Sequence, residues 1–271
     1  MTDTVSGNLG ASGAGDRRAS PSDDHVLWLR RFHPAPDAAV RLLLCPHSGG
    51  SAGYFRALSG VLSPVVEAVA VQYPGRQDRR AEPLIDDLRE LAARVVDVLA
   101  DEPGPVALFG HSMGALLAFE LARRLEHGGR EVAGLFVSGA RAPSLLGNEG
   151  LHLVDDAELL RVVRSLNGTE AELLDDEEIV QAALPLVRND TRAVETYGYQ
   201  GTTVPDLRCP IVALVGTEDP RVAVAEAEKW RDHTSGPFTL HTFPGGHFYL
   251  NSYTTALGRL MTVLLTGVTD D

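Results

Sequence analysis

Long apolar runs and cysteines are both scarce in this sequence of 271 residues. No stretch approaches the 18 or more apolar residues of a membrane-spanning helix, and the longest apolar runs, such as residues 40–45, have the length of a strand. The two cysteines, Cys45 and Cys209, lie far apart and show no metal-ligand spacing. We therefore expect no membrane span, and we expect both cysteines to be small buried side chains in a reducing compartment.

Basic residues are also in the minority, because 24 lysines and arginines face 37 aspartates and glutamates. The resulting net charge of −13 repels nucleic-acid phosphates and anionic lipids, so we expect neither nucleic acid nor a membrane as a partner. Residues 1–24 are rich in Gly, Ser, Asp and Ala and lack the basic start and apolar stretch of a secretory signal. We interpret them as a disordered tail, and we expect a cytoplasmic monomer.

The rest of the chain alternates between strand-like and helix-like segments. Short runs rich in Val and Leu predict strands at residues 26–32, 40–45, 66–72, 106–110, 134–138, 211–216 and 238–243. Amphipathic stretches predict helices between them, at residues 84–99, 115–125, 222–233 and 252–265. Apolar strands separated by single helices are typical of an α/β fold with a mostly parallel sheet covered on both faces.

One segment interrupts this alternation. Residues 141–206 hold 5 arginines and 13 acidic residues and contain no convincing strand. Amphipathic patterns in this segment predict helices around residues 157–166, 176–187 and 191–197. A helical insertion between two core strands is most simply a lid over one end of the sheet. We therefore divide the chain into a core of residues 25–140 and 207–271 and an inserted lid of residues 141–206.

The strongest chemical signal is Phe-Gly-His-Ser-Met-Gly at 109–114, which follows a predicted strand and opens a predicted helix. This is Gly-x-Ser-x-Gly in the strand–turn–helix setting of a nucleophile elbow. The turn is so tight that the residues two before and two after the serine must lack bulk, and it exposes the serine hydroxyl at the sheet edge. Ser112 is therefore the candidate nucleophile.

A serine hydroxyl becomes a good nucleophile when a base takes its proton, and the base needs an acid to fix its tautomer. His247 lies in a glycine-rich turn between a predicted strand and the last predicted helix, at the edge where the elbow lies. Asp219 follows another strand end at that edge and is the candidate acid, with Glu218 as its competitor. His111 is expected to pack beside the elbow. The order Ser112, Asp219, His247 is the order of the α/β-hydrolase fold.

A tetrahedral intermediate formed at Ser112 needs two backbone N–H groups to stabilise its oxyanion. Met113, the residue after the candidate nucleophile, supplies one of them. The second is expected from the loop Pro-His-Ser-Gly-Gly-Ser-Ala at 46–52, whose glycines let the backbone approach a bound carbonyl closely. Ser48 is the expected donor, and Gly49 is the next candidate.

Four motifs in this order resemble the stand-alone type II thioesterases that accompany modular polyketide synthases and non-ribosomal peptide synthetases. They are Cys-Pro-His-Ser-Gly-Gly-Ser-Ala at 45–52, Gln-Tyr-Pro-Gly-Arg-Gln-Asp-Arg at 72–79, Phe-Gly-His-Ser-Met-Gly-Ala at 109–115 and Pro-Gly-Gly-His-Phe-Tyr-Leu at 244–250. The resemblance covers residues 26–265, with Ser48 where that family usually has alanine. It implies a mobile lid over an acyl pocket. The implied reaction is hydrolysis of aberrant or stalled acyl groups from the phosphopantetheine arm of acyl or peptidyl carrier proteins.

The motif at 72–79 has no catalytic chemistry that its residues alone predict. Arg76 and Arg79 are candidate contacts for an acidic carrier protein or the pantetheine phosphate, or they hold their loop through salt bridges. No metal or cofactor is expected, because Ser112 supplies the nucleophile and the 46–52 loop supplies the electrophilic assistance.

Two other functions stay open at this point. One is a carboxylesterase or lipase-like enzyme with the same three residues, and the other is a non-catalytic protein that binds acyl carrier proteins. The starting methionine and the lack of a carrier domain favour a separate polypeptide over a domain of a synthase.

Overall fold

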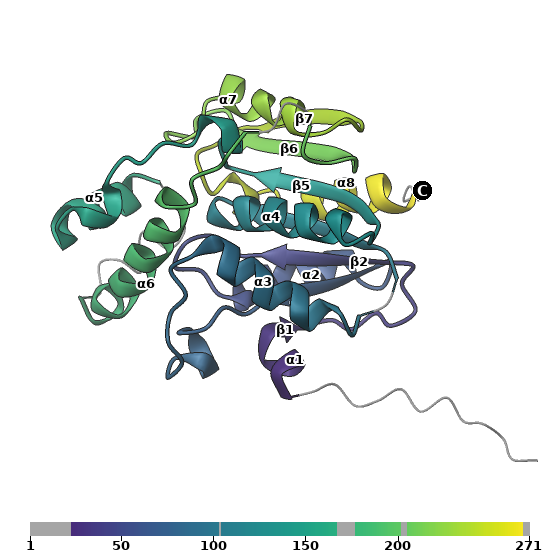
Figure 1. The fold of residues 1–271 in the computed structure, drawn as a ribbon, viewed down its shortest axis with the longest axis horizontal. Helices are drawn as coiled ribbons and strands as arrows, with labels where there is room; N and C mark the ends of the chain where they lie inside the picture. Colours follow the sequence, from purple (N-terminus) through teal and green to yellow (C-terminus); the bar gives the residue numbers. More distant parts are fainter. Residues whose placement is uncertain (1–22, 103, 167–176, 202–204, 268–271) are drawn as a thin grey trace, which may run out of the picture.

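The computed structural model describes residues 23–102, 104–166, 177–201 and 205–267 (Figure 1). The disordered tail predicted for residues 1–24 lies outside these ranges except for its last two residues, which begin a helix. Within the described ranges, no helix combines the length and the apolar character needed to cross a bilayer. Cys45 and Cys209 are both buried and carry free thiols, as predicted.

A seven-stranded sheet with the order β1-β3-β2-β4-β5-β6-β7 forms the centre of the molecule. Its strands are β1 (Leu29–Arg30), β2 (Val40–Cys45), β3 (Val66–Val71), β4 (Val106–His111), β5 (Val132–Ser138), β6 (Ile211–Gly216) and β7 (Phe238–Phe243). Every neighbouring pair is parallel except β1 and β3. The predicted α/β class with a mostly parallel sheet is confirmed.

Helices cover both faces of this sheet (Figure 1). Helices α3 (Leu88–Leu99) and α4 (Met113–His127) pack on one face, while α2 (Arg56–Leu62) and α8 (Thr254–Thr266) pack on the other. Each face buries its own apolar cluster against the sheet, so most strands are buried on both sides. This explains why the strands appear in the sequence as continuous apolar runs rather than as alternating patterns.

The strand predicted at residues 26–32 is wrong over most of its length, since only residues 29–30 form a strand. Helix α1 (Asp23–Trp28) takes its first half, and the two-residue strand β1 follows as an antiparallel edge strand. His25 and Trp28 are buried whereas Val26 is half exposed, which is the spacing of a helix turn. A short apolar run does not distinguish the two structures by its period alone. Helix α2 was not predicted, and the helix predicted at 222–233 divides into α7 (Val224–Glu228) and a 3₁₀ helix, Lys229–His233.

The described part of the segment 141–206 contains helices and no strand, and it lies beyond the carboxyl ends of the parallel strands (Figure 1). Two 3₁₀ turns, Pro143–Leu145 and Leu151–Leu153, precede α5 (Asp156–Ser165) and α6 (Glu177–Glu195). The helices predicted at 176–187 and 191–197 are therefore one continuous helix. The polar residues 188–190 interrupt the apolar pattern of the sequence, but the helix continues through them and buries Asp190.

Candidate active site

The elbow at Ser112 is the sharpest backbone feature of the site. Strand β4 ends at His111 and α4 begins at Met113, while Ser112 between them adopts φ 56° and ψ −121°. A Cβ on Gly110 would lie 1.9 Å from the carbonyl oxygen of Gly114, and a Cβ on Gly114 would lie 2.0 Å from that of Cys45. Both positions therefore require glycine, and the strained conformation presents Ser112 at the end of the sheet.

Asp219 and His247 meet at the ends of the neighbouring strands β6 and β7. His247 Nδ1 lies 2.8 Å from Asp219 Oδ2, and both side chains are almost completely buried. The other carboxylate oxygen of Asp219 accepts hydrogen bonds from the backbone N–H groups of Arg221 (2.8 Å) and Val222 (3.3 Å). The carboxylate is thus fixed on both oxygens, whereas the competing Glu218 is exposed.

His111 packs beside the elbow, as predicted. Its ring is fully buried, its Nδ1 lies 3.0 Å from Ser138 Oγ, and its centroid is 4.9 Å from that of His247. Burial is the main reason why the pKa of His111 lies well below its ordinary value of 6.5, and the neighbouring His247 and His47 lower it further. The lowered pKa of His111 favours a neutral imidazole next to the Asp219–His247 pair.

A pocket of about 250 Å³ is lined both by the predicted nucleophile and base and by the two predicted oxyanion donors. Ser112, His247, Met113 and Ser48 all lie on its wall. Most of the remaining wall is apolar and comes from α4 and from the segment 141–206, through Leu116, Leu146, Leu151, Leu159, Val162, Val163, Leu166, Ala183, Val187 and Val194. The pocket can therefore receive an apolar chain next to the serine hydroxyl.

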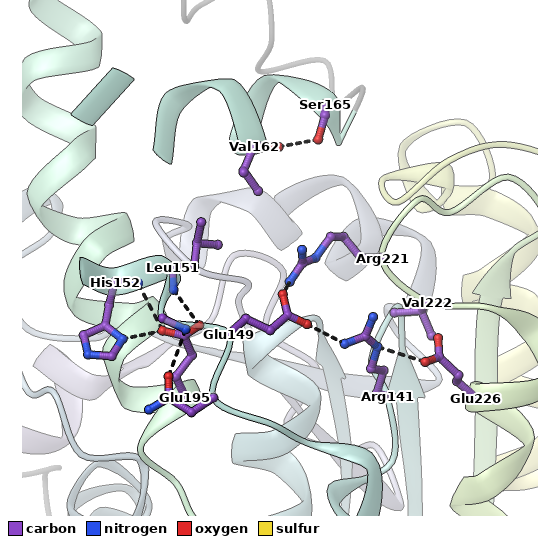
Figure 2. Close-up of polar contacts among 12 residues, drawn as sticks. Arg141, Glu149, Leu151, His152, Val162, Ser165, Glu195, Arg221, Val222 and Glu226 are labelled. Atoms are coloured by element: carbon purple, nitrogen blue, oxygen red, sulfur yellow. Dashed lines mark hydrogen bonds and ion pairs between the residues drawn. The ribbon is translucent and has the colours of Figure 1, made fainter. Parts of the chain in front are cut away.

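Charged residues that the sequence analysis did not single out form part of the same wall. Figure 2 shows Glu149 between Arg141 and Arg221, which it contacts at 2.7 and 2.8 Å, and Arg141 continues to Glu226 at 3.1 Å. The hydrogen bond from Arg141, together with Arg221, holds the pKa of Glu149 below its ordinary value. These ion pairs tie the segment 141–206 to the core.

Glu195 makes a second polar anchor within that segment. One of its carboxylate oxygens accepts from the Leu151 N–H at 2.9 Å, and the other contacts the N–H and the ring of His152 (Figure 2). Burial raises the pKa of Glu195, but the hydrogen bonds from His152 and Leu151 outweigh it and hold that pKa below its ordinary value. No sequence pattern marks these pairs, because their partners are up to 44 residues apart.

The structure places Arg76 and Arg79 away from solvent, each only 4% exposed. Arg76 pairs with Asp190, and Arg79 pairs with Glu82 and donates to the Gln72 carbonyl at 2.7 Å. Contact of these arginines with a carrier protein or the pantetheine phosphate stays a prediction, which their burial does not favour. The alternative, salt bridges that hold the loop, describes their contacts.

The 46–52 loop contacts the segment 141–206 as well as the core. The Gly49 N–H donates to Asp190 Oδ2 at 2.8 Å, and Ser48 Oγ donates to the Val187 carbonyl at 3.4 Å. Asp190 was not predicted, although an acidic residue inside an apolar helix pattern was the signal that could have found it. Among the described residues, no three His, Cys, Asp or Glu side chains gather as metal ligands would.

Comparison with known proteins places this geometry in a family. The family model described as the thioesterase domain matches residues 40–262. The chain belongs to the thioesterase family. It is an α/β-hydrolase-fold enzyme that acts on thioesters, and the predicted resemblance to type II thioesterases of polyketide and non-ribosomal peptide pathways is confirmed.

Two curated relatives and two solved structures illustrate the similarity. Thioesterase PikA5 of Streptomyces venezuelae is 52% identical over 84% of this chain and 82% of its own length. A probable cadicidin biosynthesis thioesterase of Streptomyces griseus is 47% identical over 89% of this chain and 68% of its own.

Among solved structures, the type II thioesterase BorB from the borrelidin biosynthetic cluster has a TM-score of 0.82 and 48% identity, covering 88% of this thioesterase and 98% of BorB. YbtT, a type II thioesterase from the yersiniabactin pathway, has a TM-score of 0.79 and 30% identity, covering 89% of this chain and 98% of its own.

Proposed function

We propose that this thioesterase hydrolyses acyl groups from the phosphopantetheine thiol of acyl or peptidyl carrier proteins and so removes aberrant or stalled chains from a synthase. The observation that carries the proposal is the buried Asp219–His247 pair, whose His247 lines the same apolar pocket as the strained Ser112. The relatives support the substrate class, because BorB and YbtT are type II thioesterases of biosynthetic pathways of this kind.

The proposed reaction proceeds through an acyl-enzyme. His247 Nε2 takes the Ser112 proton while Ser112 Oγ attacks the thioester carbonyl, and Asp219 stabilises the imidazolium through the Nδ1–H bond. The oxyanion accepts hydrogen bonds from the N–H groups of Met113 and Ser48. The C–S bond then breaks, and the thiolate takes the proton from His247. In the second half, His247 takes a proton from a water molecule as the water oxygen attacks the acyl-enzyme carbonyl, and it returns this proton to Ser112 Oγ as the Ser112 ester bond breaks and the acid is released.

Ser48 is preferred to Gly49 as the second donor because the Gly49 N–H already donates to Asp190. The serine at position 48 in place of the usual alanine does not conflict with this role, since only the backbone N–H is used. Its hydroxyl is directed to the carbonyl of Val187.

Ser112→Ala tests the mechanism. We expect a loss on the order of 10⁶ in kcat, the typical effect of removing a triad serine, with an unchanged thermal unfolding midpoint. A variant that keeps more than about a tenth of the activity would contradict the proposal. Dialysis against EDTA should leave the activity of the wild type unchanged, whereas a loss that zinc restores would indicate a different active site.

The substrate class is tested by comparing an acyl-N-acetylcysteamine thioester with the p-nitrophenyl ester of the same acid, and then with the same acyl group on a phosphopantetheinylated carrier protein. We expect kcat/KM to be highest for the carrier-bound thioester. A preference for the oxygen ester would favour the carboxylesterase alternative. Failure of a fluorophosphonate to label Ser112 would favour a non-catalytic binding protein.

A further inference from the structure

The motif at 72–79, which has no catalytic chemistry of its own, contacts both ends of the 46–52 loop. At one end of the loop, the Tyr73 hydroxyl donates to the Pro46 carbonyl at 3.0 Å. At the other end, the Ala52 N–H donates to Gln72 Oε1 at 3.0 Å. The middle of the loop is held by Asp190, which also pairs with Arg76 of the motif.

Asp190 and Arg76 are a buried pair, 2% and 4% exposed. The Arg76 guanidinium also donates to the Pro74 carbonyl at 2.9 Å and lies 5.0 Å from the centre of the Tyr73 ring, so its position is fixed from three sides. Because a buried ion pair carries a large desolvation cost, its contribution to stability alone is a weak reason for its presence. The pair instead places a carboxylate oxygen beside one backbone N–H of the loop.

That N–H belongs to Gly49, the neighbour of the proposed oxyanion donor Ser48. Gly49 adopts φ +77°, and a Cβ there would lie 2.8 Å from Val187 Cγ2, so the Val187 side chain of helix α6 leaves no room for a side chain at this position of the loop. The hydrogen bond from the Gly49 N–H to Asp190 fixes the peptide group between Ser48 and Gly49. The preceding peptide group, between His47 and Ser48, carries the Ser48 N–H. A shift of the loop at Gly49 would therefore move the Ser48 donor.

We propose that Asp190, held by Arg76, is a positioning residue for the oxyanion hole: it fixes the 46–52 loop so that the Ser48 N–H points at the developing oxyanion. The inference rests on the proposed function, since it takes the Ser48 N–H as a donor to the tetrahedral intermediate. It also gives the 72–79 motif a function, which is to support this loop from three points.

The test separates the hydrogen bond from the buried charge. Removing Asp190 alone leaves Arg76 buried without its partner and strongly destabilises the fold, so both test variants carry Arg76→Met. Arg76→Met with Asp190→Asn keeps an amide oxygen that accepts the Gly49 N–H. Arg76→Met with Asp190→Leu has nearly the same volume and no acceptor. Arg192→Met is the control on the same helix, because it removes only an exposed ion pair with Asp86 at 3.1 Å.

We expect the Arg192→Met control to keep kcat within about threefold of the wild type, and the Asn variant to keep a kcat at least about tenfold above that of the Leu variant, because its amide oxygen still accepts the Gly49 N–H. The Leu variant should lose at least about 30-fold in kcat with KM changed less than about threefold, because a displaced oxyanion donor affects the transition state and not substrate binding. Affinity for a trifluoromethyl ketone, whose hemiketal carries an oxyanion after Ser112 adds to it, should fall by the same factor as kcat. Affinity for a non-hydrolysable amide analogue should not change.

Equal kcat values for the folded Asn and Leu variants would overturn the inference. So would a loss in the Leu variant that appears only in KM, or that the trifluoromethyl ketone does not reproduce. Ser112→Ala, measured alongside, distinguishes this outcome from failure of the mechanism. If Ser112→Ala is inactive and the Asn and Leu variants are equal, only the role of Asp190 is wrong. If Ser112→Ala is active, the proposed function itself fails.

Discussion

Gly114→Ala is the smallest change that should disable this enzyme. The added Cβ would lie 2.0 Å from the Cys45 carbonyl oxygen and 2.6 Å from that of Pro46. Both atoms are backbone, so no side chain can rotate away. Cys45 is the last residue of β2 and pairs with Gly110 of β4, which holds it in the sheet. The start of α4 and the 46–52 loop must therefore move apart.

The size of this movement sets the expected loss. An ordinary carbon–oxygen contact of about 3.4 Å requires a separation of roughly 1.4 Å beyond the present one. The start of α4 carries the Met113 N–H and the loop carries the Ser48 N–H, so the two proposed oxyanion donors separate. Because misplacement by about 1 Å can cost 10²-fold, we expect kcat/KM to fall by about 10²- to 10³-fold. Overpacking of about 2–3 kcal/mol should also lower Tm by roughly 5–10 °C.

The assay is hydrolysis of an acyl-N-acetylcysteamine thioester, with Tm followed by calorimetry. Gly53→Ala is the matched control, because a Cβ there would lie an ordinary 3.6 Å from Ser51 Oγ, and it should keep wild-type activity and stability. If Gly114→Ala keeps more than about a third of the wild-type kcat/KM, then the close contact between α4 and the loop does not control catalysis.

Three further measurements address the acid, a buried histidine and the lid. Asp219→Asn should lose about 10⁴-fold in kcat by favouring the wrong imidazole tautomer while Glu218→Gln stays near wild type, and the reverse result would make Glu218 the acid. Burial lowers the pKa of His111 in the folded state below 6.5, so the unfolded chain binds more protons than the folded chain, and the free energy of unfolding falls as pH drops below about 6.5. In urea unfolding, His111→Gln should lose less of this free energy than the wild type between pH 5 and 6.5. Equal losses in the two proteins would contradict this. In hydrogen exchange, the amides of α5 should exchange much faster than those of β4, and they should slow when Ser112 carries a non-hydrolysable acyl group. Residues 188–195 should be protected with and without this acyl group. Equal protection of α5 and β4 would indicate a rigid lid.

Most of the sheet could be predicted because its strands are buried on both faces. Strands β2 and β6 have the predicted bounds, since an apolar run that ends in a turn signal identifies such a strand without tertiary information. The edge strand β7 also has its predicted bounds, although it is only partly buried. Helices α1 and α2 were missed because both have fewer than eight residues, too few for a helical period to stand out.

In the candidate site, too, some residues could be predicted from the sequence and others could not. The elbow, Asp219 and His247 could be found because each follows a strand end, and parallel strands bring their carboxyl ends to one edge. The partners of Arg76 and Glu149 could not be found in this way. Asp190 is 114 residues from Arg76, and Arg221 is 72 residues from Glu149, so only the folded chain brings these charges together.

The contacts of α6 limit how a lid can move in this enzyme. Its C-terminal half is attached to the core through the Asp190–Arg76 pair and through Asn189, whose side chain donates to the Ile85 carbonyl at 2.8 Å. Among the described residues, α5 packs with the N-terminal half of α6 in a cluster of three buried side chains, Leu159, Val180 and Leu184. We therefore expect the mobile part of the predicted lid to be α5 and the first half of α6. If the lid opens while the 46–52 loop stays in place, α5 and the first half of α6 must rotate about a hinge near Val187. This residue lines the pocket and contacts the loop through its carbonyl oxygen, which accepts from Ser48 Oγ.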